Sequence, residues 1–364
     1  MIIGSFLENN PNEKRIVFSL DLIKKYVKNE IKVLLPKGYG VFSNISDQAL
    51  QESGAILDDK DKIINQLDIL VKISLEHDDP LDKLKNQASI IVSDFDKNNE
   101  DVIKKINQKK INLFCLNFLP RITRAQSMDV LSSQANLAGY KAVIDSTYEF
   151  NKAVPMMMTA AGTVSPAKFF IIGAGVAGLQ AIATAKRLGG VVSATDVRLA
   201  SKEQVESLGG RFIFVEDAEN LETAGGYAKE ASEDFKKKQE QLLKETIKKQ
   251  DIIICTALIP GKKAPRILTE EMVLSMQPGS VICDLAASQG GNSAFCEPGK
   301  IIEKNGIKII GLTNFPSRIS ESASNLLAKN FFNFIEIIYD KENKKVLVNK
   351  DDEIIKNVLI SGEI

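Results

Sequence analysis

The chain has 364 residues, of which 44% are hydrophobic and 26% charged, and its 47 Lys and Arg residues balance 47 Asp and Glu residues. This composition is typical of a globular protein, and the length predicts two or three domains. The balanced charge excludes an overall attraction to nucleic acid or to an anionic bilayer. No stretch reaches the roughly 20 apolar residues that a membrane-spanning helix needs, and the N-terminus lacks the basic segment of a signal peptide.

Residues that could ligate a metal are few. No C-x-x-C pair occurs among the cysteines, which are Cys115, Cys255, Cys283 and Cys296, and His77 is the only histidine. Three of the cysteines lie in or beside apolar runs typical of strands, which favours buried, reduced thiols over disulfides. With one histidine a zinc site is difficult to build, so we expect no metal.

Short apolar runs alternate with amphipathic stretches along the whole chain, a pattern that predicts βαβ units and mostly parallel sheets. In the first third we expect strands over residues 31–35, 68–73, 89–92 and 111–116, and helices over 19–29, 47–53 and 99–109. A further helix is expected over 140–150. The run Met156–Met158 that follows it is interpreted as core packing at a helix end.

A second set of elements begins near Lys168. We expect strands over 168–173, 191–196, 211–215, 251–255, 280–284 and 307–311, and helices over 178–188, 202–208 and 227–249. Ser201 begins a predicted capping box, Ser-Lys-Glu-Gln, and Gly209 a predicted C-cap. The charge-rich 227–249 stretch is interpreted as a solvated surface helix.

The last expected helix, over 326–338, is predicted to return to the first domain. The predicted fold class is therefore α/β, with two Rossmann-like doubly wound parallel-sheet domains, the second inserted in the first. We expect the first domain to comprise residues 1–131 and 325–364, and the second, a dinucleotide-binding domain, residues 132–324.

A glycine-rich turn is the strongest local motif. The expected strand from Lys168 is followed by Gly173, Ala174, Gly175, Val176, Ala177 and Gly178, and then by a helix-forming stretch. In such a turn the first glycine permits the tight bend, the second lets the backbone approach a pyrophosphate, and the third allows close helix–strand packing. The helix N-terminus attracts the negative charge of the ligand. A turn that serves packing alone is the alternative.

Asp196 ends the next expected strand, 21 residues after Gly175. This is the usual place of a carboxylate that binds the adenosine ribose of NAD and repels the 2′-phosphate of NADP. The sequence therefore predicts NAD(H). Arg198, two residues later, weakens that selectivity, since an arginine near this site can accept a 2′-phosphate.

The middle of the chain closely resembles the α subunit of proton-translocating nicotinamide nucleotide transhydrogenases. Residues 121–134, RITRAQSMDVLSSQ, match a signature loop of that family. The match continues in NLAGY, MMMTAAGT, ATDVR, ETAGGYAKE and TALIPG, which begin at residues 136, 156, 194, 222 and 256. The resemblance is dense from about 117 to 330. The chain resembles the short α1 type, whose membrane spans are separate polypeptides.

Site residues are implied by the resemblance at matching positions. Around the nicotinamide it places Arg121, Asp129 and Ser132, which would hold the carboxamide and ribose, and Gln126, which would reach toward NADP(H) on a partner. Tyr227 and Gly226 match a mobile loop that closes over NAD(H). Val197, Ala257 and Leu258 complete the predicted cofactor-binding set. A surface loop that only caps a helix is the alternative for residues 121–132.

Alanine dehydrogenases share this architecture and are the main alternative. Oxidation of an amino acid requires a general acid/base, usually a histidine, near the nicotinamide. The matching stretch 90–95 contains no histidine, and His77 is interpreted as an exposed loop residue. Arg15 and Lys72 remain at positions that bind substrate carboxylate in those enzymes, whereas Ser288 replaces an aspartate. Phe6-Leu7-Glu8 replaces a Pro-Lys-Glu motif, so we expect a degenerate substrate site.

Hydride transfer between two nicotinamides needs no acid or base, only close apposition and exclusion of water. The resemblance implies transfer with Si/Re specificity between NADH bound here and NADP⁺ on a partner subunit. Coupling to proton translocation would come from membrane-spanning subunits. It further implies a homodimer in the cytoplasm, attached to the inner membrane through its partners. A non-catalytic NAD-binding scaffold is the third hypothesis.

Overall fold

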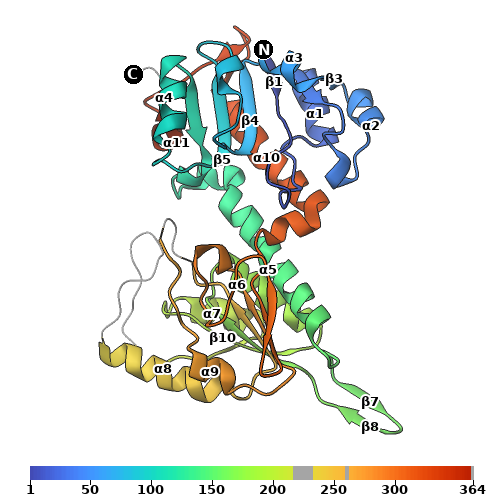
Figure 1. The fold of residues 1–364 in the computed structure, drawn as a ribbon, viewed down its shortest axis with the longest axis vertical. Coiled ribbons are helices and arrows are strands. Elements are labelled where there is room, and N and C mark those ends of the chain that lie inside the picture. The colour runs from blue at the N-terminus through green and yellow to red at the C-terminus, as the bar shows by residue number, and fades with distance from the viewer. Residues whose placement is uncertain (216–232, 259–261, 362–364) are drawn as a thin grey trace. The chain divides into compact units, whose positions relative to one another are not determined.

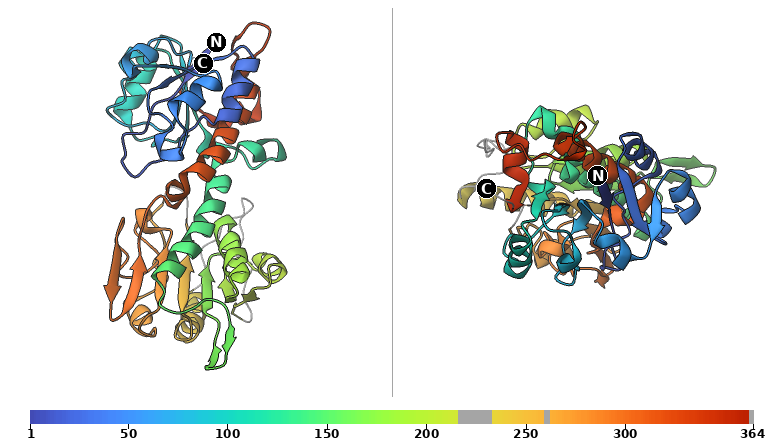
Figure 2. Two further views of the ribbon diagram at one scale, coloured as in Figure 1. Left: turned by 90° about the vertical axis from the view of Figure 1, so that its right-hand side faces the viewer. Right: turned by 90° about the horizontal axis from the view of Figure 1, so that it is seen from above.

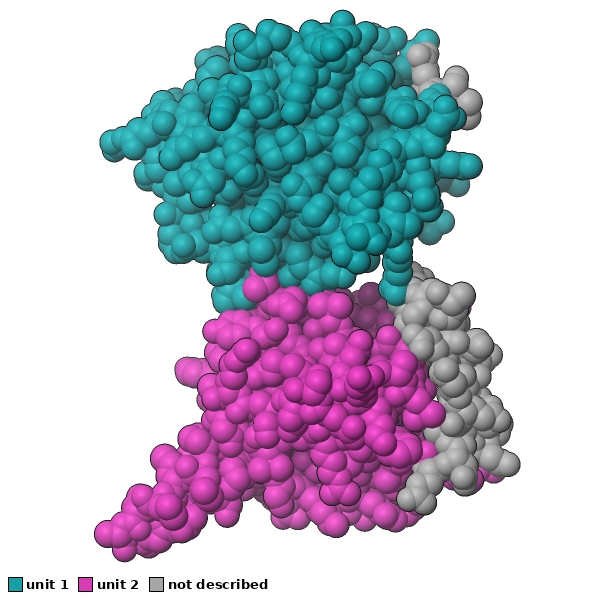
Figure 3. All heavy atoms as spheres, turned by 180° about the vertical axis from the view of Figure 1, so that it is seen from behind, with its two compact units in different colours: residues 1–134, 316–364 teal, residues 135–315 magenta. Residues whose placement is uncertain are grey.

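The computed structural model describes residues 1–215, 233–258 and 262–361. The chain divides into two compact units, shown in teal and magenta in Figure 3. Unit 1 comprises residues 1–134 and 316–364, and unit 2 comprises 135–315. Unit 1 is thus built from both ends of the chain. The expected boundaries at 131 and 324 fall inside two helices, α5 and α10.

In unit 1 the described residues form a seven-stranded sheet in the order β18-β6-β5-β4-β1-β2-β3, parallel except for β18. Its strands are β1 (Ile2–Gly4), β2 (Lys32–Pro36), β3 (Ile56–Asp58), β4 (Ile69–Ser74), β5 (Ser89–Asp94), β6 (Asn112–Cys115) and β18 (Leu359–Ser361). A separate two-stranded sheet pairs β16 (Tyr339–Asp340) with β17 (Lys345–Val346). The order 3-2-1-4-5-6 over the parallel strands is the doubly wound topology.

Helices cover both faces of this sheet (Figure 1). They are α1 (Leu20–Lys28), α2 (Asp47–Glu52), α3 (Lys60–Ile64), α4 (Glu100–Gln108), α10 (Ser320–Ile338) and α11 (Glu353–Val358). Successive β4 side chains point to opposite faces, so Ile69 and Val71 pack with α1 and α10, whereas Leu70 packs with α3 and α4. The C-terminal helix therefore completes the core of unit 1.

Unit 2 repeats the topology. Its described strands lie in the order β11-β10-β9-β12-β13-β15-β14, parallel except for β14. They are β9 (Lys168–Ile172), β10 (Val191–Thr195), β11 (Arg211–Phe212), β12 (Ile252–Cys255), β13 (Val281–Asp284), β14 (Ile301–Lys304) and β15 (Ile307–Ile310). The predicted α/β class, with two doubly wound sheets, is confirmed.

The helices of unit 2 form two layers. They are α5 (Val130–Glu149), α6 (Val176–Arg187), α7 (Ser201–Ser207), α8 (Glu233–Ile247) and α9 (Glu270–Leu274). Phe169 and Ile171 of β9 face α5, α6 and α7, whereas Phe170 and Ile172 face α8 and α9. This alternation explains why β9 is apolar at four consecutive positions: both of its faces are buried.

Three local expectations were wrong. Ser201 is not an N-cap: its N–H donates to Arg198 O at 3.1 Å, α7 starts at Ser201 itself, and Ala200 is the cap without a side-chain hydrogen bond. The expected strand 211–215 ends at Phe212. Met156–Met158 are not core residues, because they are 60%, 42% and 79% exposed. Gly209, with φ of +78° beyond the end of α7, is confirmed as a C-cap glycine.

The methionine run belongs to a hairpin. It joins β7 (Met157–Thr159) to β8 (Gly162–Val164), and all six of these strand residues are exposed. The hairpin extends away from the rest of unit 2 and is green in Figure 2. Polar turn-forming residues did not mark it in the sequence, because its turn uses Ala160, Ala161 and Gly162, the last with φ of +136°.

Cys115, Cys255 and Cys283 are buried free thiols, as expected, and Cys296 is half-buried. Within the described ranges, no helix combines the length and apolarity needed to cross a bilayer.

Candidate nucleotide-binding site

The glycine-rich turn joins β9 to α6 with little spare room. Gly173 has φ of +96°, a region that favours glycine, and its N–H donates to Thr195 O at 2.9 Å. A Cβ on Gly178 would lie 1.9 Å from Gly173 O. Both glycines are therefore required by the backbone of the turn.

Gly175 differs from these two glycines. Its φ is −79°, and a Cβ there would meet no atom within 4 Å. Packing within the described chain therefore does not require a glycine here. Gly175 is also the N-cap of the 12-residue helix α6, whose first N–H groups have no intrahelical partner. Open space in front of such N–H groups suits a pyrophosphate.

The neighbouring strand supports the turn. The Thr256 hydroxyl, just after β12, lies 2.9 Å from Gly173 O, which it reaches as a hydrogen-bond donor. Asn292 is fully buried; its Nδ2 donates to Ala257 O at 2.9 Å, and its Oδ1 accepts from Ala257 N at 3.2 Å. These bonds fix the backbone before Leu258, which is 42% exposed. Sequence reasoning missed Asn292, since no local motif distinguishes it.

Asp196 follows β10 and accepts four hydrogen bonds. Oδ2 accepts from Ala174 N at 2.7 Å and from Arg198 Nη2 at 2.8 Å. Oδ1 accepts from both Arg198 N and Arg198 Nε at 2.9 Å. Burial raises the pKa of Asp196, but the bonds from Arg198 and Ala174 outweigh it, so the pKa lies below its usual range. The carboxylate is thus ionised and tied to the glycine turn.

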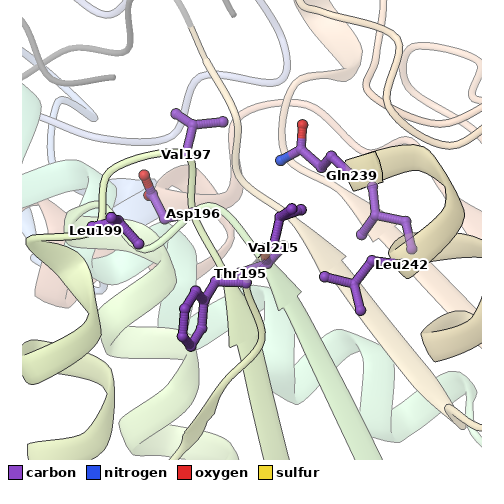
Figure 4. A pocket seen from close by; sticks show the side chains of 9 residues that line it. Thr195, Asp196, Val197, Leu199, Val215, Gln239 and Leu242 are labelled. Atoms are coloured by element: carbon purple, nitrogen blue, oxygen red, sulfur yellow. The ribbon is translucent and has the colours of Figure 1, made fainter. Parts of the chain in front are cut away.

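A small pocket adjoins this carboxylate (Figure 4). Its walls come from the segments after β10 and β11 and from α8, and they include Asp196, Val197, Leu199, Phe214, Val215, Gln239 and Leu242. Most of these side chains are apolar. A flat aromatic base beside a ribose-binding carboxylate is the kind of group that such walls accept.

The predicted nicotinamide loop lies in unit 1, in the short helix η4 (Thr123–Met128) and the start of α5. Asp129 Oδ1 accepts from Ser132 N at 2.9 Å, and its Oδ2 from the Ser132 hydroxyl at 2.5 Å. The carboxylate therefore satisfies an N–H at the start of α5. Asn330 and Asn333 of α10 both donate to Ser127 O, which fixes η4 on unit 1.

Other side chains of the loop face outward. Arg121 and Gln126 are exposed, and Arg124 forms a two-pronged ion pair with Asp352 at 2.7 and 2.8 Å. The predicted lid residues Tyr227 and Gly226 lie outside the described residues. The structure brings together Gly173–Gly178, Asp196–Arg198 and Ala257–Leu258 within unit 2, whereas Arg121, Gln126 and Asp129 belong to unit 1.

The two basic residues of the alternative, dehydrogenase-like site are already paired. Lys72 is fully buried, and its Nζ lies 2.5 and 2.7 Å from the two carboxylate oxygens of Asp79. Arg15 makes two hydrogen bonds to Glu13, at 2.8 and 2.6 Å, and one to Gln134 at 2.9 Å. Neither cation is left uncompensated for a substrate carboxylate.

Glu8 completes the cluster around Lys72. Its Oε1 accepts from Ile73 N at 2.8 Å, and its Oε2 lies 3.5 Å from Lys72 Nζ, without a hydrogen-bond partner in the described part of the chain. Burial raises the pKa of Glu8 to about 7, with Lys72 opposing and Asp79 and Glu13 adding to the rise. One buried cation therefore faces two carboxylates.

Acid/base and metal chemistry find few candidates. The His77 side chain is 76% exposed and lies 3.9 Å from Asp101, which confirms it as an exposed loop residue. Across residues 1–215, 233–258 and 262–361, no cluster of three or more His, Cys, Asp or Glu residues could hold a metal ion. β5, which contains most of the 90–95 stretch, has no histidine.

Comparisons with known proteins agree with this geometry. Residues 6–138 match the N-terminal domain of the Alanine dehydrogenase/PNT family, and residues 142–363 match its C-terminal domain. The chain is 49% identical to the first of the polypeptides that make up NAD(P) transhydrogenase subunit alpha in Rhodospirillum rubrum, over 98% of this chain and 95% of that protein. It is 24% identical to an alanine dehydrogenase of Methanococcus maripaludis, over 96% and 90% of the two chains.

Among solved structures, a transhydrogenase from Sinorhizobium meliloti has a TM-score of 0.90 at 44% identity, covering 100% of this chain and 99% of that one. These similarities confirm the resemblance inferred from residues 121–134 and its neighbouring motifs.

Proposed function

Because the chain belongs to the Alanine dehydrogenase/PNT family, we propose that it is the NAD(H)-binding subunit of a proton-translocating NAD(P) transhydrogenase. The observation that carries the proposal is the β9–turn–α6 unit, with open space at Gly175 and an ionised carboxylate at Asp196. The dinucleotide would lie across the turn, with its pyrophosphate at the N-terminus of α6 and its adenosine ribose at Asp196. The adenine would enter the pocket of Figure 4.

A bound NAD(H) supplies or accepts a hydride at C4 of its nicotinamide. The chain would contribute positioning: Arg121, Asp129 and Ser132 hold the carboxamide and ribose, and Gln126 reaches toward NADP(H) on a partner subunit. The hydrogen bonds from Ser132 keep the Asp129 carboxylate in one orientation. Gly226 and Tyr227 would close over the ring. No proton changes place on either nicotinamide, so no residue has to act as acid or base.

The partners in this proposal are membrane-spanning subunits and an NADP(H)-binding subunit. They would couple transfer to proton translocation and attach the chain to the inner membrane from the cytoplasmic side. Two copies of the chain would form a homodimer, which sedimentation of the purified chain tests directly. Direct transfer would be specific for the Si and Re faces of the two rings.

An alanine dehydrogenase activity receives little support from the site. Its reaction needs a proton acceptor beside the nicotinamide, and the only histidine is an exposed loop residue. Its substrate carboxylate would need a free cation, and Lys72 is bound to Asp79. A scaffold without catalysis would not need the Arg121–Ser132 loop to position a ring.

The test uses NADH labelled with deuterium at C4, mixed with the chain, its partner subunits and NADP⁺. Direct transfer predicts deuterated NADPH without exchange into water, measured by mass spectrometry for each label position. Gln126→Ala should lower the transfer rate at least tenfold with unchanged NADH affinity, and Ser127→Ala in the same exposed turn is the matched control. Alanine-dependent reduction of NAD⁺ without label transfer would reverse the assignment, and NADH binding with neither reaction would support the scaffold.

A further inference from the structure

The Asp196 carboxylate has no vacant acceptor position. A carboxylate offers about four lone-pair sites, and the four hydrogen bonds of Asp196 fill two on each oxygen. The ribose hydroxyls of a nucleotide must donate to this same carboxylate. A donor therefore has to leave before the ribose can bind.

Only one of the donors can leave without unfolding the turn. Two are backbone N–H groups, those of Ala174 and Arg198, which are fixed by β9, β10 and the turn. The other two belong to the Arg198 guanidinium, whose side chain is 22% exposed, whereas that of Asp196 is 6% exposed. A flexible side chain at the rim of the site can rotate away, and the backbone cannot.

We propose that Arg198 is a specificity-determining gate, whose guanidinium occupies the ribose-binding positions of Asp196 and has to be displaced by the nucleotide. The inference rests on the proposed binding of NAD(H) at this site. It differs from a direct role for Arg198 in holding the nucleotide, because the arginine here competes with the ribose.

The pairing also sets the charge that an incoming nucleotide meets. Asp196 and Arg198 together are neutral, so the pair repels a 2′-phosphate less than a lone carboxylate does. Displaced from Asp196, the guanidinium becomes available to that phosphate. The gate therefore weakens NADH binding and at the same time lowers discrimination against NADPH.

The experiment compares Arg198→Met with wild type by calorimetric titration of NADH and of NADPH. Removal of the competing donor should tighten NADH binding at least about threefold, because the ribose then displaces water rather than a charge-assisted pair. NADPH binding should weaken, so that the NADH/NADPH affinity ratio rises at least about tenfold, and raised salt should reduce the NADPH effect. Arg187→Met, an exposed charge at the end of α6, is the matched control and should change neither affinity.

Arg198→Lys keeps the charge without the two-pronged geometry, and its NADH affinity should lie between those of wild type and Arg198→Met. Circular dichroism establishes that each variant is folded. Weaker or unchanged NADH binding by folded Arg198→Met, with wild type binding normally, would overturn the gate alone. A wild-type chain that binds no NADH would overturn the proposed function itself.

Discussion

The two units have the same strand order but use the switch point of their sheets differently. In each, the first strand of the unit lies between the strands that follow it on one side and those that return on the other. In unit 2, β9 leads through a glycine turn directly into α6, and Gly175 faces open space. In unit 1, β1 leads into a long loop whose Glu8 is drawn into a buried cluster with Lys72 and Asp79.

The comparison teaches that topology provides a crevice and side chains decide its use. Ligands of open parallel sheets bind where the strand order reverses. Unit 2 leaves this place to backbone N–H groups and one saturated carboxylate. Unit 1 fills it with an internal ion pair. Its carboxyl oxygen Glu8 Oε2 lacks a hydrogen bond within the described residues, whereas both oxygens of Asp196 are fully bonded.

The largest effect is expected for Lys72→Met, which leaves the buried carboxylates of unit 1 without their cation. Removal of one partner from a buried pair should lower the free energy of unfolding by about 3–5 kcal/mol. Urea unfolding measures the loss, and hydrogen exchange in β4 assigns it to unit 1. Lys85→Met breaks an ion pair with Asp68 whose side chains are 40% and 37% exposed, and it should cost less than about 1 kcal/mol. Equal losses would mean that burial of the Lys72 pair has no energetic weight.

Glu8→Gln tests the same cluster by its pH dependence. The carboxyl has a pKa of about 7 when folded against 4.5 as its ordinary value, so the folded state holds a proton that the unfolded chain releases. The stabilisation is complete below pH 4.5 and is lost as the pH rises to about 7. Glu8→Gln should remove this loss, worth up to about 3 kcal/mol between pH 5 and pH 8. Parallel stability curves for variant and wild type would contradict the prediction.

In unit 2, Gly178→Ala should disturb the turn. Its methyl group would lie 1.9 Å from Gly173 O, a backbone atom that cannot move without displacing β9 or α6. We expect a loss of about 1–3 kcal/mol in stability, as in other overpacked sites. Thermal denaturation checks this, and a melting temperature equal to that of wild type would show that the turn has more freedom than its geometry allows.

Gly175→Ala is the matched partner of that variant and separates binding from folding. Its methyl group meets no described atom within 4 Å, so stability should change by less than about 0.5 kcal/mol. It would stand where a pyrophosphate approaches, so NADH should bind at least about tenfold more weakly, equivalent to ~1.4 kcal/mol. Wild-type affinity in a folded Gly175→Ala chain would place the nucleotide elsewhere.

Elements with a local signature could be predicted from the sequence. The turn at Gly173–Gly178 is determined by residues within six positions, and β9 by its unbroken apolar run. The strands β3, β14 and β18 were missed because each spans only three or four residues and depends on a neighbouring strand for its hydrogen bonds. The pairing of Lys72 with Asp79 could not be read from the chain, since their contact depends on how the loop after β4 folds back.

Asp196 illustrates the limit most clearly. Its spacing from the glycine turn predicted a ribose-binding carboxylate, but spacing does not reveal how many donors already surround it. Arg198 was expected to contact the nucleotide, and the structure places its guanidinium on Asp196 instead. Sequence position indicated the residue, and only coordinates revealed its hydrogen bonds.

The projecting hairpin of unit 2 has a consequence for oxidative damage. Its three thioethers, on Met156, Met157 and Met158, are 60%, 42% and 79% exposed. Met272 and Met276, in contrast, are 1% and 4% exposed within the core. A peroxide should therefore convert the hairpin methionines to sulfoxides first, and these polar groups would leave the cores of both units intact. The arm would serve as a sacrificial antioxidant surface, since methionine sulfoxide can be reduced enzymatically.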